Sequence, residues 1–199
     1  MNEHRGSRPG TGAGVRKPVV RAVFLVGFMG AGKTSVGRIL SQRLGWRFED
    51  LDTRIETRER KTVAEIFRSA GEAGFRSAEH EALRELLLEL ASGTPVVAAL
   101  GGGAFVQEKN AALLASEETP TVFLDTPVEE LWERCAAPGE AERPLRSDLP
   151  RFQELFRARL PHYRQAQLRV ETRGKSVEQV AEEVLGRLGL GERVPGKET

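Results

Sequence analysis

The chain has 199 residues, of which 39% are hydrophobic and 30% are charged, and this length and composition predict a single globular domain. Lysine and arginine number 30 against 29 for aspartate and glutamate, so no overall charge attracts nucleic acid or an anionic membrane. The only cysteine, Cys135, excludes an internal disulfide and a cysteine-based zinc site. No signal-peptide core and no apolar stretch of the roughly 20 residues that span a bilayer is present, so we expect a soluble cytoplasmic protein.

Both ends of the chain are rich in glycine, proline and charged residues, which offer little apolar surface to bury. We therefore expect flexible tails over residues 1–18 and 189–199. One domain is expected between them, over residues 19–188.

The first segment that carries chemistry follows an apolar stretch from Val19 to Val26. Residues 27–34 read G-F-M-G-A-G-K-T and match G-x-x-x-x-G-K-[ST], the phosphate-binding loop of nucleoside triphosphatases. Glycines let backbone N–H groups close around phosphate oxygens, Lys33 adds a positive charge, and the Thr34 hydroxyl can ligate magnesium. The loop predicts that the chain binds ATP or GTP.

Short apolar runs rich in β-branched residues alternate with longer segments of helical period. This alternation is typical of a parallel sheet covered by helices on both faces. The expected strands are Val19 to Val26, Arg47 to Glu49, Pro95 to Leu100, Thr121 to Leu124 and Leu168 to Thr172. We expect an α/β fold, a three-layer sandwich around a five-stranded parallel sheet.

Two carboxylates, Asp50 and Asp52, come just after the second expected strand. If strand geometry continues, both project to one side, at the sheet edge where the phosphate loop also lies. A kinase needs one carboxylate near its metal and another near the attacking hydroxyl. The alternative is that both only cap the next helix; the nearby phosphate loop favours the functional interpretation.

Arg76 and Glu79 are three residues apart in a segment of helical period. Glu79 could therefore orient Arg76 toward a carboxylate or phosphate, although an ordinary surface ion pair is the alternative. Gly101, Gly102 and Gly103 follow the third expected strand directly. They allow the backbone to approach a ligand closely, or they form a tight turn without a ligand.

Prolines and Gly139 interrupt the chain between two helical segments, Val128 to Ala136 and Phe152 to Gln165. We expect a mobile lid there, over about residues 137–149. A closing lid could bring guanidinium groups to a transferring phosphate. The arginines in or beside this segment are Arg134, Arg143, Arg146 and Arg164, and for each a solvated surface position is the alternative.

In order along the chain stand G-F-M-G-A-G-K-T-S-V-G, F-E-D-L-D-T-R-I-E, E-I-F, G-E-x-G-F-R-x-x-E, L-G-G-G and R-P-L. This ordered set resembles the shikimate kinase family over essentially residues 19–188. The resemblance implies a nucleoside-monophosphate-kinase-like fold and transfer of the ATP γ-phosphate to the 3-hydroxyl of shikimate, in chorismate and aromatic amino-acid biosynthesis. It further implies Mg²⁺ as cofactor and a monomer without nucleic-acid or membrane partners.

The resemblance also implies roles for individual residues. Lys33 and Arg143 would act on the transferring phosphate, and Asp52 would hold the shikimate hydroxyls and accept the proton. Thr34 would bind Mg²⁺ and Asp50 would assist through water. The residues assigned to ATP are Gly30, Ala31, Gly32, Lys33, Thr34, Ser35, Arg134, Arg143 and Arg173. The residues assigned to shikimate are Asp52, Arg76, Gly101, Gly102, Gly103 and Arg164, with Arg76 and Arg164 on its carboxylate.

Two departures from the family pattern stand out. Leu100 occupies a position that is commonly small or hydroxylated, and Lys61 stands where a glycine is usual, so we expect a cost in stability or positioning. The rival interpretations are another small-molecule kinase of this fold, such as a gluconate kinase, and a nucleotide-sensing module without turnover. Asp52, Arg76 and Arg164 favour shikimate, because one carboxylate and two cations suit a polyhydroxylated carboxylic acid.

Overall fold

The computed structural model describes residues 20–91, 93–136 and 148–190. The whole expected N-terminal tail, the expected C-terminal tail apart from Gly189 and Leu190, and the greater part of the expected lid lie outside this range. The elements in order are β1 (Ala22–Val26), α1 (Lys33–Leu44), β2 (Arg47–Asp50), α2 (Leu51–Glu59), α3 (Val63–Ala91), β3 (Val96–Ala99), α4 (Glu108–Ser116), β4 (Thr121–Asp125), α5 (Val128–Ala136), α6 (Leu149–Tyr163), β5 (Leu168–Glu171) and α7 (Val177–Leu188). Among these helices, none combines the length and the apolar character needed to cross a membrane.

The five strands form one parallel sheet in the order β2-β3-β1-β4-β5, which confirms the expected fold class. In the centre, Phe24 of β1 lies between Ala98 of β3 and Thr121 of β4. Every residue of β1 and β3 is buried, whereas β5 at the edge alternates between buried and exposed residues. The continuous apolar runs of the central strands follow from this burial, because helices cover both of their faces.

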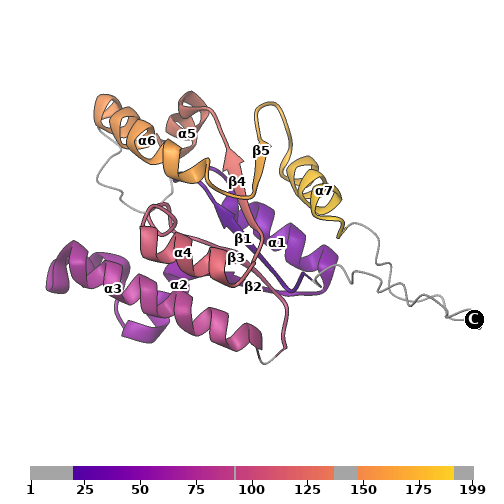
Figure 1. Cartoon of the computed structure of the whole chain (residues 1–199). Coiled ribbons are helices and arrows are strands. Elements are labelled where there is room, and N and C mark those ends of the chain that lie inside the picture. The colour runs from indigo at the N-terminus through magenta and orange to yellow at the C-terminus, as the bar shows by residue number, and fades with distance from the viewer. Residues whose placement is uncertain (1–19, 92, 137–147, 191–199) are drawn as a thin grey trace, which may run out of the picture.

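Helices form the outer layers of the sandwich (Figure 1). Helices α1 and α7 pack side by side against one face of the sheet, and α3 and α4 lie on the opposite side. Helices α5 and α6 lie toward the carboxyl ends of the strands. That end of an open parallel sheet is where ligands bind.

Helix α3 is bent at Gly71, whose φ of 68° and ψ of −173° are not helical. Only glycine adopts this backbone region readily, because it has no Cβ atom. Beyond the bend, α3 carries an apolar stripe whose residues Phe75, Ala82, Leu83, Leu86 and Leu87 are all buried.

Two helix ends refine the boundaries read from the sequence. The C-cap of helix α2 is Arg60, with a left-handed φ of 53°, so the position that suits glycine is Arg60 and not Lys61. Helix α7 is followed by its C-cap Gly189, with φ of 67°, and Leu190 packs against the core. These first two residues of the expected C-terminal tail therefore belong to the folded domain.

Candidate active site

The phosphate loop joins β1 to α1 through three glycines in unusual conformations. Gly27, Gly30 and Gly32 have φ angles of 144°, 78° and 85°, which residues with a Cβ atom rarely adopt. Helix α1 begins at Lys33 directly after the loop, so its first N–H groups and the positive end of its dipole point into the loop. The Lys33 Nζ donates to the carbonyl oxygens of Gly27 and Phe28, at 2.9 Å each, which folds its charge over the same loop.

Asp50 connects the phosphate loop to the start of α2. Its Oδ2 accepts a hydrogen bond from the Thr34 hydroxyl at 3.0 Å, and its Oδ1 accepts from the Asp52 N–H at 3.1 Å. Strand geometry therefore does not continue through Asp52, because β2 ends at Asp50 and α2 begins at Leu51. The helix-capping interpretation is correct for Asp50, and the same carboxylate also contacts the loop hydroxyl.

The triple glycine after β3 lies against charged side chains from three other elements. A Cβ atom on Gly101 would lie 2.6 Å from Oδ1 of Asp52, and one on Gly103 would lie 2.5 Å from Nη1 of Arg76. None of these three glycines is among those with a positive φ. Glycine is therefore required there for space rather than for backbone conformation, and the turn brings Asp52 and Arg76 to one site.

Arg76 is held by two carboxylates on its own helix. Its Nη1 lies 2.9 Å from Oε2 of Glu79, and its Nη2 lies 3.3 Å from Oε1 of Glu72. The Glu79 side chain is only 1% exposed, and this burial raises its pKa above the ordinary value of 4.5. The pair is thus partly inside the protein and not the ordinary surface ion pair that the sequence left open.

The second oxygen of Glu79 faces the glycine turn. Oε1 has no hydrogen-bond partner among the described residues, and a Cβ atom on Gly101 would lie 3.2 Å from it. Oε2 also accepts from the Gln107 side chain. Glu79 therefore orients Arg76 with one oxygen and presents the other toward Asp52.

A second arginine at the turn comes from α6, but it is Arg159 and not Arg164. Its Nη1 would lie 3.6 Å from a Cβ atom on Gly102, and its guanidinium lies 5.8 Å from the centre of the Phe28 ring in the phosphate loop. Arg164, in contrast, is exposed at the C-cap of α6. The helical period was the missed signal: Arg159 stands four residues before the buried Tyr163 and shares its face, and the Tyr163 hydroxyl donates to the Gly102 carbonyl.

The residues assigned to the adenine side are spread more widely. Arg134 on α5 donates from Nη1 to the Gly30 carbonyl at 3.3 Å and pairs with Glu130 at 2.9 Å, which places it beside the phosphate loop. Arg173 is exposed in the turn between β5 and α7. Arg143, assigned to the transferring phosphate, lies outside the described residues.

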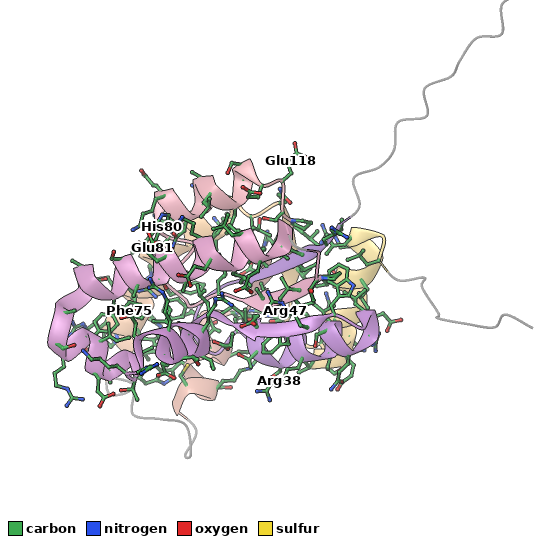
Figure 2. All side chains as sticks on the ribbon, turned by 90° about the horizontal axis from the view of Figure 1, so that it is seen from below. Arg38, Arg47, Phe75, His80, Glu81 and Glu118 are labelled. Atoms are coloured by element: carbon green, nitrogen blue, oxygen red, sulfur yellow. The ribbon has the colours of Figure 1, made fainter. Side chains whose placement is uncertain are left out.

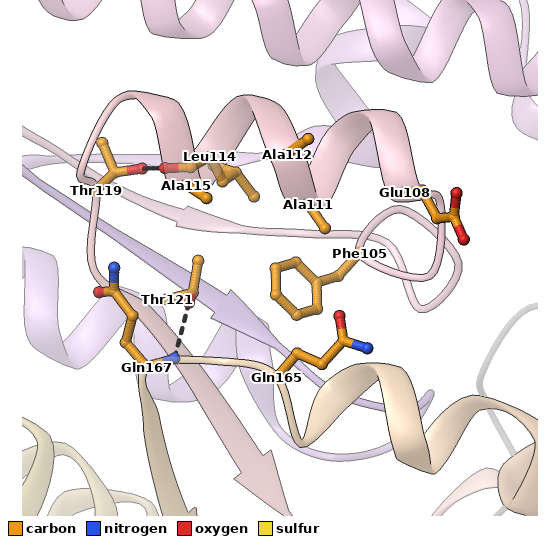
Figure 3. Close-up of a pocket in the computed structure, with 10 residues that line it drawn as sticks. All are labelled: Phe105, Glu108, Ala111, Ala112, Leu114, Ala115, Thr119, Thr121, Gln165 and Gln167. Atoms are coloured by element: carbon orange, nitrogen blue, oxygen red, sulfur yellow. Dashed lines mark hydrogen bonds between the residues drawn. The ribbon is translucent and has the colours of Figure 1, made fainter.

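A separate cavity of about 310 Å³ lies between α4 and the connection from α6 to β5 (Figure 3). Phe105 and Leu114 line it together with the side chains of Gln165 and Gln167. Its lining residues come from segments other than the phosphate loop, α2 and α3. The cavity is therefore distinct from the place where Asp52, Arg76 and Arg159 meet.

The geometry thus combines a phosphate-binding loop with an adjoining charged site. The acceptor side, defined here as Asp52, Arg76, Glu79, Arg159 and the glycine turn 101–103, contains two cations and two carboxylates. These groups come from α2, α3, α6 and the turn after β3. Such a site suits a small acid that also carries hydroxyl groups, because guanidinium pairs with carboxylate and carboxylate accepts from hydroxyl.

Known proteins resemble the chain over most of its length. The family model described as "Shikimate kinase" matches residues 29–189. The shikimate kinase of Persephonella marina is 39% identical, with 85% of this chain and 99% of that protein covered. The shikimate kinase of Thermus thermophilus is 42% identical, with 83% and 89% covered.

Solved structures lead to the same family. Shikimate kinase from Acinetobacter baumannii in complex with shikimate superimposes with a TM-score of 0.74 at 34% identity, covering 85% of this chain and 93% of that one. A gluconokinase from Sinorhizobium meliloti gives a TM-score of 0.56 at 20% identity, covering 84% and 91%, a likeness of fold alone. The chain belongs to the shikimate kinase family.

Proposed function

We propose that the chain transfers the γ-phosphoryl group of ATP to the 3-hydroxyl of shikimate, a step of chorismate and aromatic amino-acid biosynthesis. The observation that carries the proposal is the meeting of Asp52, Arg76 and Arg159 at the glycine turn, beside the phosphate loop. Two guanidinium groups match the carboxylate of shikimate and Asp52 matches its hydroxyls. Membership of the family supports the same substrate.

The carboxylate of shikimate binds between the two arginines. Arg76 is already oriented by Glu72 and Glu79, and Arg159 lies over the Phe28 ring. Both guanidinium groups therefore lose little conformational freedom when the substrate arrives. Fixing one end of the ring orients the hydroxyls at its other end toward the phosphate loop, which converts binding into alignment for transfer.

Asp52 acts on the attacking hydroxyl. Its carboxylate lies at the first glycine of the turn, and its backbone N–H is anchored to Asp50 at the edge of the phosphate loop. It accepts a hydrogen bond from the 3-hydroxyl and takes the proton as the oxygen bonds to phosphorus. Positioning contributes more than base strength, because phosphoryl transfer passes through a loose transition state with little charge on the attacking oxygen.

The donor side holds the nucleotide phosphates. The N–H groups of the loop and of the start of α1 bind phosphate oxygens, and Lys33 neutralises charge on the transferring group. Arg143 has the same role in our proposal and lies outside the described residues. Arg134 and Arg173 flank the adenine.

Thr34 and Asp50 are the groups that would hold Mg²⁺, Asp50 through water. The Thr34 hydroxyl donates a hydrogen bond to Oδ2 of Asp50 at 3.0 Å, so the two oxygens lie close together. Magnesium prefers oxygen ligands of this kind. The described residues contain no group of three or more His, Cys, Asp or Glu that could hold a metal. This fits magnesium, which usually binds through one or two protein oxygens, waters and substrate phosphates. When held there, Mg²⁺ would supply positive charge that offsets the charge of the ATP phosphates.

Release of ADP, measured with and without shikimate, tests the proposal. We expect ADP release to depend on ATP, Mg²⁺ and shikimate together, with gluconate and nucleoside monophosphates inactive as acceptors. Turnover with gluconate but not shikimate would replace the proposed acceptor. Nucleotide binding without turnover on any acceptor would favour the sensing module. A cytoplasmic location and a monomeric state stay predictions, which fractionation and light scattering can check.

A further inference from the structure

We propose that Asn110 is a positioning residue for the acceptor side, and that His80 keeps its side chain in place. His80 pairs with Asn110, and Asn110 donates to a backbone carbonyl, so we assign neither residue a contact with the substrate itself. Asn110 acts through Ala104, the residue that follows the glycine turn. This inference rests on the proposed function, because it concerns how the shikimate site is held in shape.

Asn110 is completely buried at the first turns of α4 and uses both ends of its amide. Its Nδ2 donates to the Ala104 carbonyl at 3.0 Å, and its Oδ1 lies 2.7 Å from Nδ1 of His80 on α3. Since the nitrogen of the amide faces Ala104, Oδ1 is the acceptor and His80 Nδ1 carries the proton. The Ala104 carbonyl, which can only accept, thus fixes which way the amide points, and the imidazole supplies the matching donor on the other side.

The Ala104 carbonyl belongs to a closed turn that contains all three glycines. The Ala104 N–H donates to the Gly101 carbonyl at 3.0 Å, and the Gln107 N–H donates to the Ala104 carbonyl at 3.3 Å. On the opposite side the Tyr163 hydroxyl donates to the Gly102 carbonyl. Side-chain donors from two helices therefore hold the carbonyl oxygens of this segment. If Ala104 shifts, Gly101 and the groups packed on it shift as well.

A second contact joins the same two helices. On α3, Glu79 precedes His80, and its Oε2 accepts from the side chain of Gln107, three residues before Asn110. Figure 2 labels His80 on the side of α3 that lies toward α4. Glu79 and His80, on the helix that carries Arg76, are thus hydrogen-bonded to the N-cap of α4 and to its first turn. The pair His80 and Asn110 sets the distance between the Arg76 guanidinium and the turn that faces it.

Replacement of Asn110 by alanine tests the proposal by steady-state kinetics with each substrate varied in turn. We expect the KM for shikimate to rise about tenfold, the size of effect that loss of one buried hydrogen bond produces. The KM for ATP should stay within about twofold, because the phosphate loop keeps its own contacts. A purely structural role would lower the melting temperature without separating the two KM values.

His80 gives a milder second test, because it is only half-buried. His80→Leu removes the donor to Asn110 and should raise the shikimate KM by a few-fold, roughly threefold to fivefold. His80→Gln keeps an N–H donor and should restore part of the loss. If the asparagine variant does not fold, this pair decides the question by itself.

Thr119→Val is the matched control, because Thr119 donates to the Leu114 carbonyl at 3.1 Å at the other end of α4. It should lower stability without changing the KM for shikimate. Equal KM shifts for both substrates, no shift at all, or the same shift in the control would overturn the proposal. An inactive wild-type protein would instead contradict the proposed function, so the two failures are distinguishable.

Discussion

The donor and acceptor sides of the site are built in different ways. The donor side is almost one continuous segment, β1, the phosphate loop and the start of α1, joined by Asp50 from the end of β2. The acceptor side collects single residues from α2, α3, α6 and the turn after β3. Sequence motifs describe local segments, so they define the first side well and leave the second dependent on packing.

This difference affects how each side responds to mutation. On the donor side the helix dipole and the loop N–H groups are fixed by backbone geometry. On the acceptor side the shape depends on contacts between side chains, such as those of Glu79 with Arg76 and of Asn110 with Ala104. We therefore expect donor variants to lower turnover, and acceptor variants to raise the KM for shikimate without raising that for ATP, except at Asp52, which acts on the reacting hydroxyl itself.

The largest effect is expected from Lys33→Ala. It removes the charge that neutralises the transferring phosphate, so turnover should fall by roughly 10²- to 10³-fold, the cost of losing such a group. A coupled assay of ADP release measures this loss. A variant with more than about a tenth of wild-type turnover would show that the loop backbone alone carries the donor side.

Asp52→Asn tests the acceptor side at its chemical centre. The amide is nearly the same size but accepts no proton, so turnover should fall by roughly two decades or more. Binding of ATP, measured by calorimetry, should change little. Near wild-type turnover would mean that the attacking hydroxyl needs no carboxylate at this position.

The pair Arg159→Ala and Arg164→Ala decides which arginine of α6 serves the acceptor. Arg159 lies at the glycine turn and Arg164 is exposed, so the first variant should raise the shikimate KM by roughly 10- to 100-fold. The second should leave it near the wild-type value. The reverse outcome would restore the assignment made from the sequence.

Glu79→Gln should reveal the burial of the carboxyl group through pH. Burial raises the pKa of Glu79 above 4.5, so the neutral form stabilises the fold at low pH. This contribution is lost as the pH rises through the folded-state pKa. The unfolding free energy of the variant, relative to wild type, should therefore increase with pH between the unfolded-state pKa of Glu79 and its higher folded-state pKa.

Urea unfolding from about pH 4 to about pH 8 measures this slope. Glu72→Gln is the control, because Glu72 bonds the same guanidinium but its side chain is 72% exposed. The control should show a flatter dependence. Parallel curves for both variants would mean that the loss of a bond to Arg76, and not burial, accounts for the change.

The smallest effect concerns the C-terminal end of α2, the helix that carries Asp52 in its first turn. Arg60 has a left-handed φ of 53°, which glycine adopts without strain, so Arg60→Gly should stabilise the protein by about 0.5–1 kcal/mol. Lys61→Gly, one residue later, should gain nothing and lose a little stability through chain entropy. Thermal unfolding compares the stability of the two variants. If only Lys61→Gly raised the melting temperature, position 61 and not position 60 would be the one that suits glycine.

The sequence predicted the fold class and the five strands to within a few residues at each end, because apolar runs and helical periods are local signals. It also predicted that Asp52, Arg76 and the triple glycine share a site. The sequence assigned Arg164 from its motif position alone, whereas Arg159 becomes visible only through the helical register that the buried Tyr163 imposes. The sequence does not indicate a role for Asn110, because a single asparagine in a segment of helical period matches no motif.

By itself, the sequence determined that this protein has a loop for a nucleotide phosphate and folds as a parallel sheet covered by helices. Both follow from contiguous residues whose backbone conformation depends on their own glycines and apolar spacing. The tertiary structure decided which arginine reaches the acceptor, why the glycines need space against Asp52 and Arg76, and how Asn110 holds their turn. Those properties depend on distances between segments that are far apart in the chain, and only packing sets such distances.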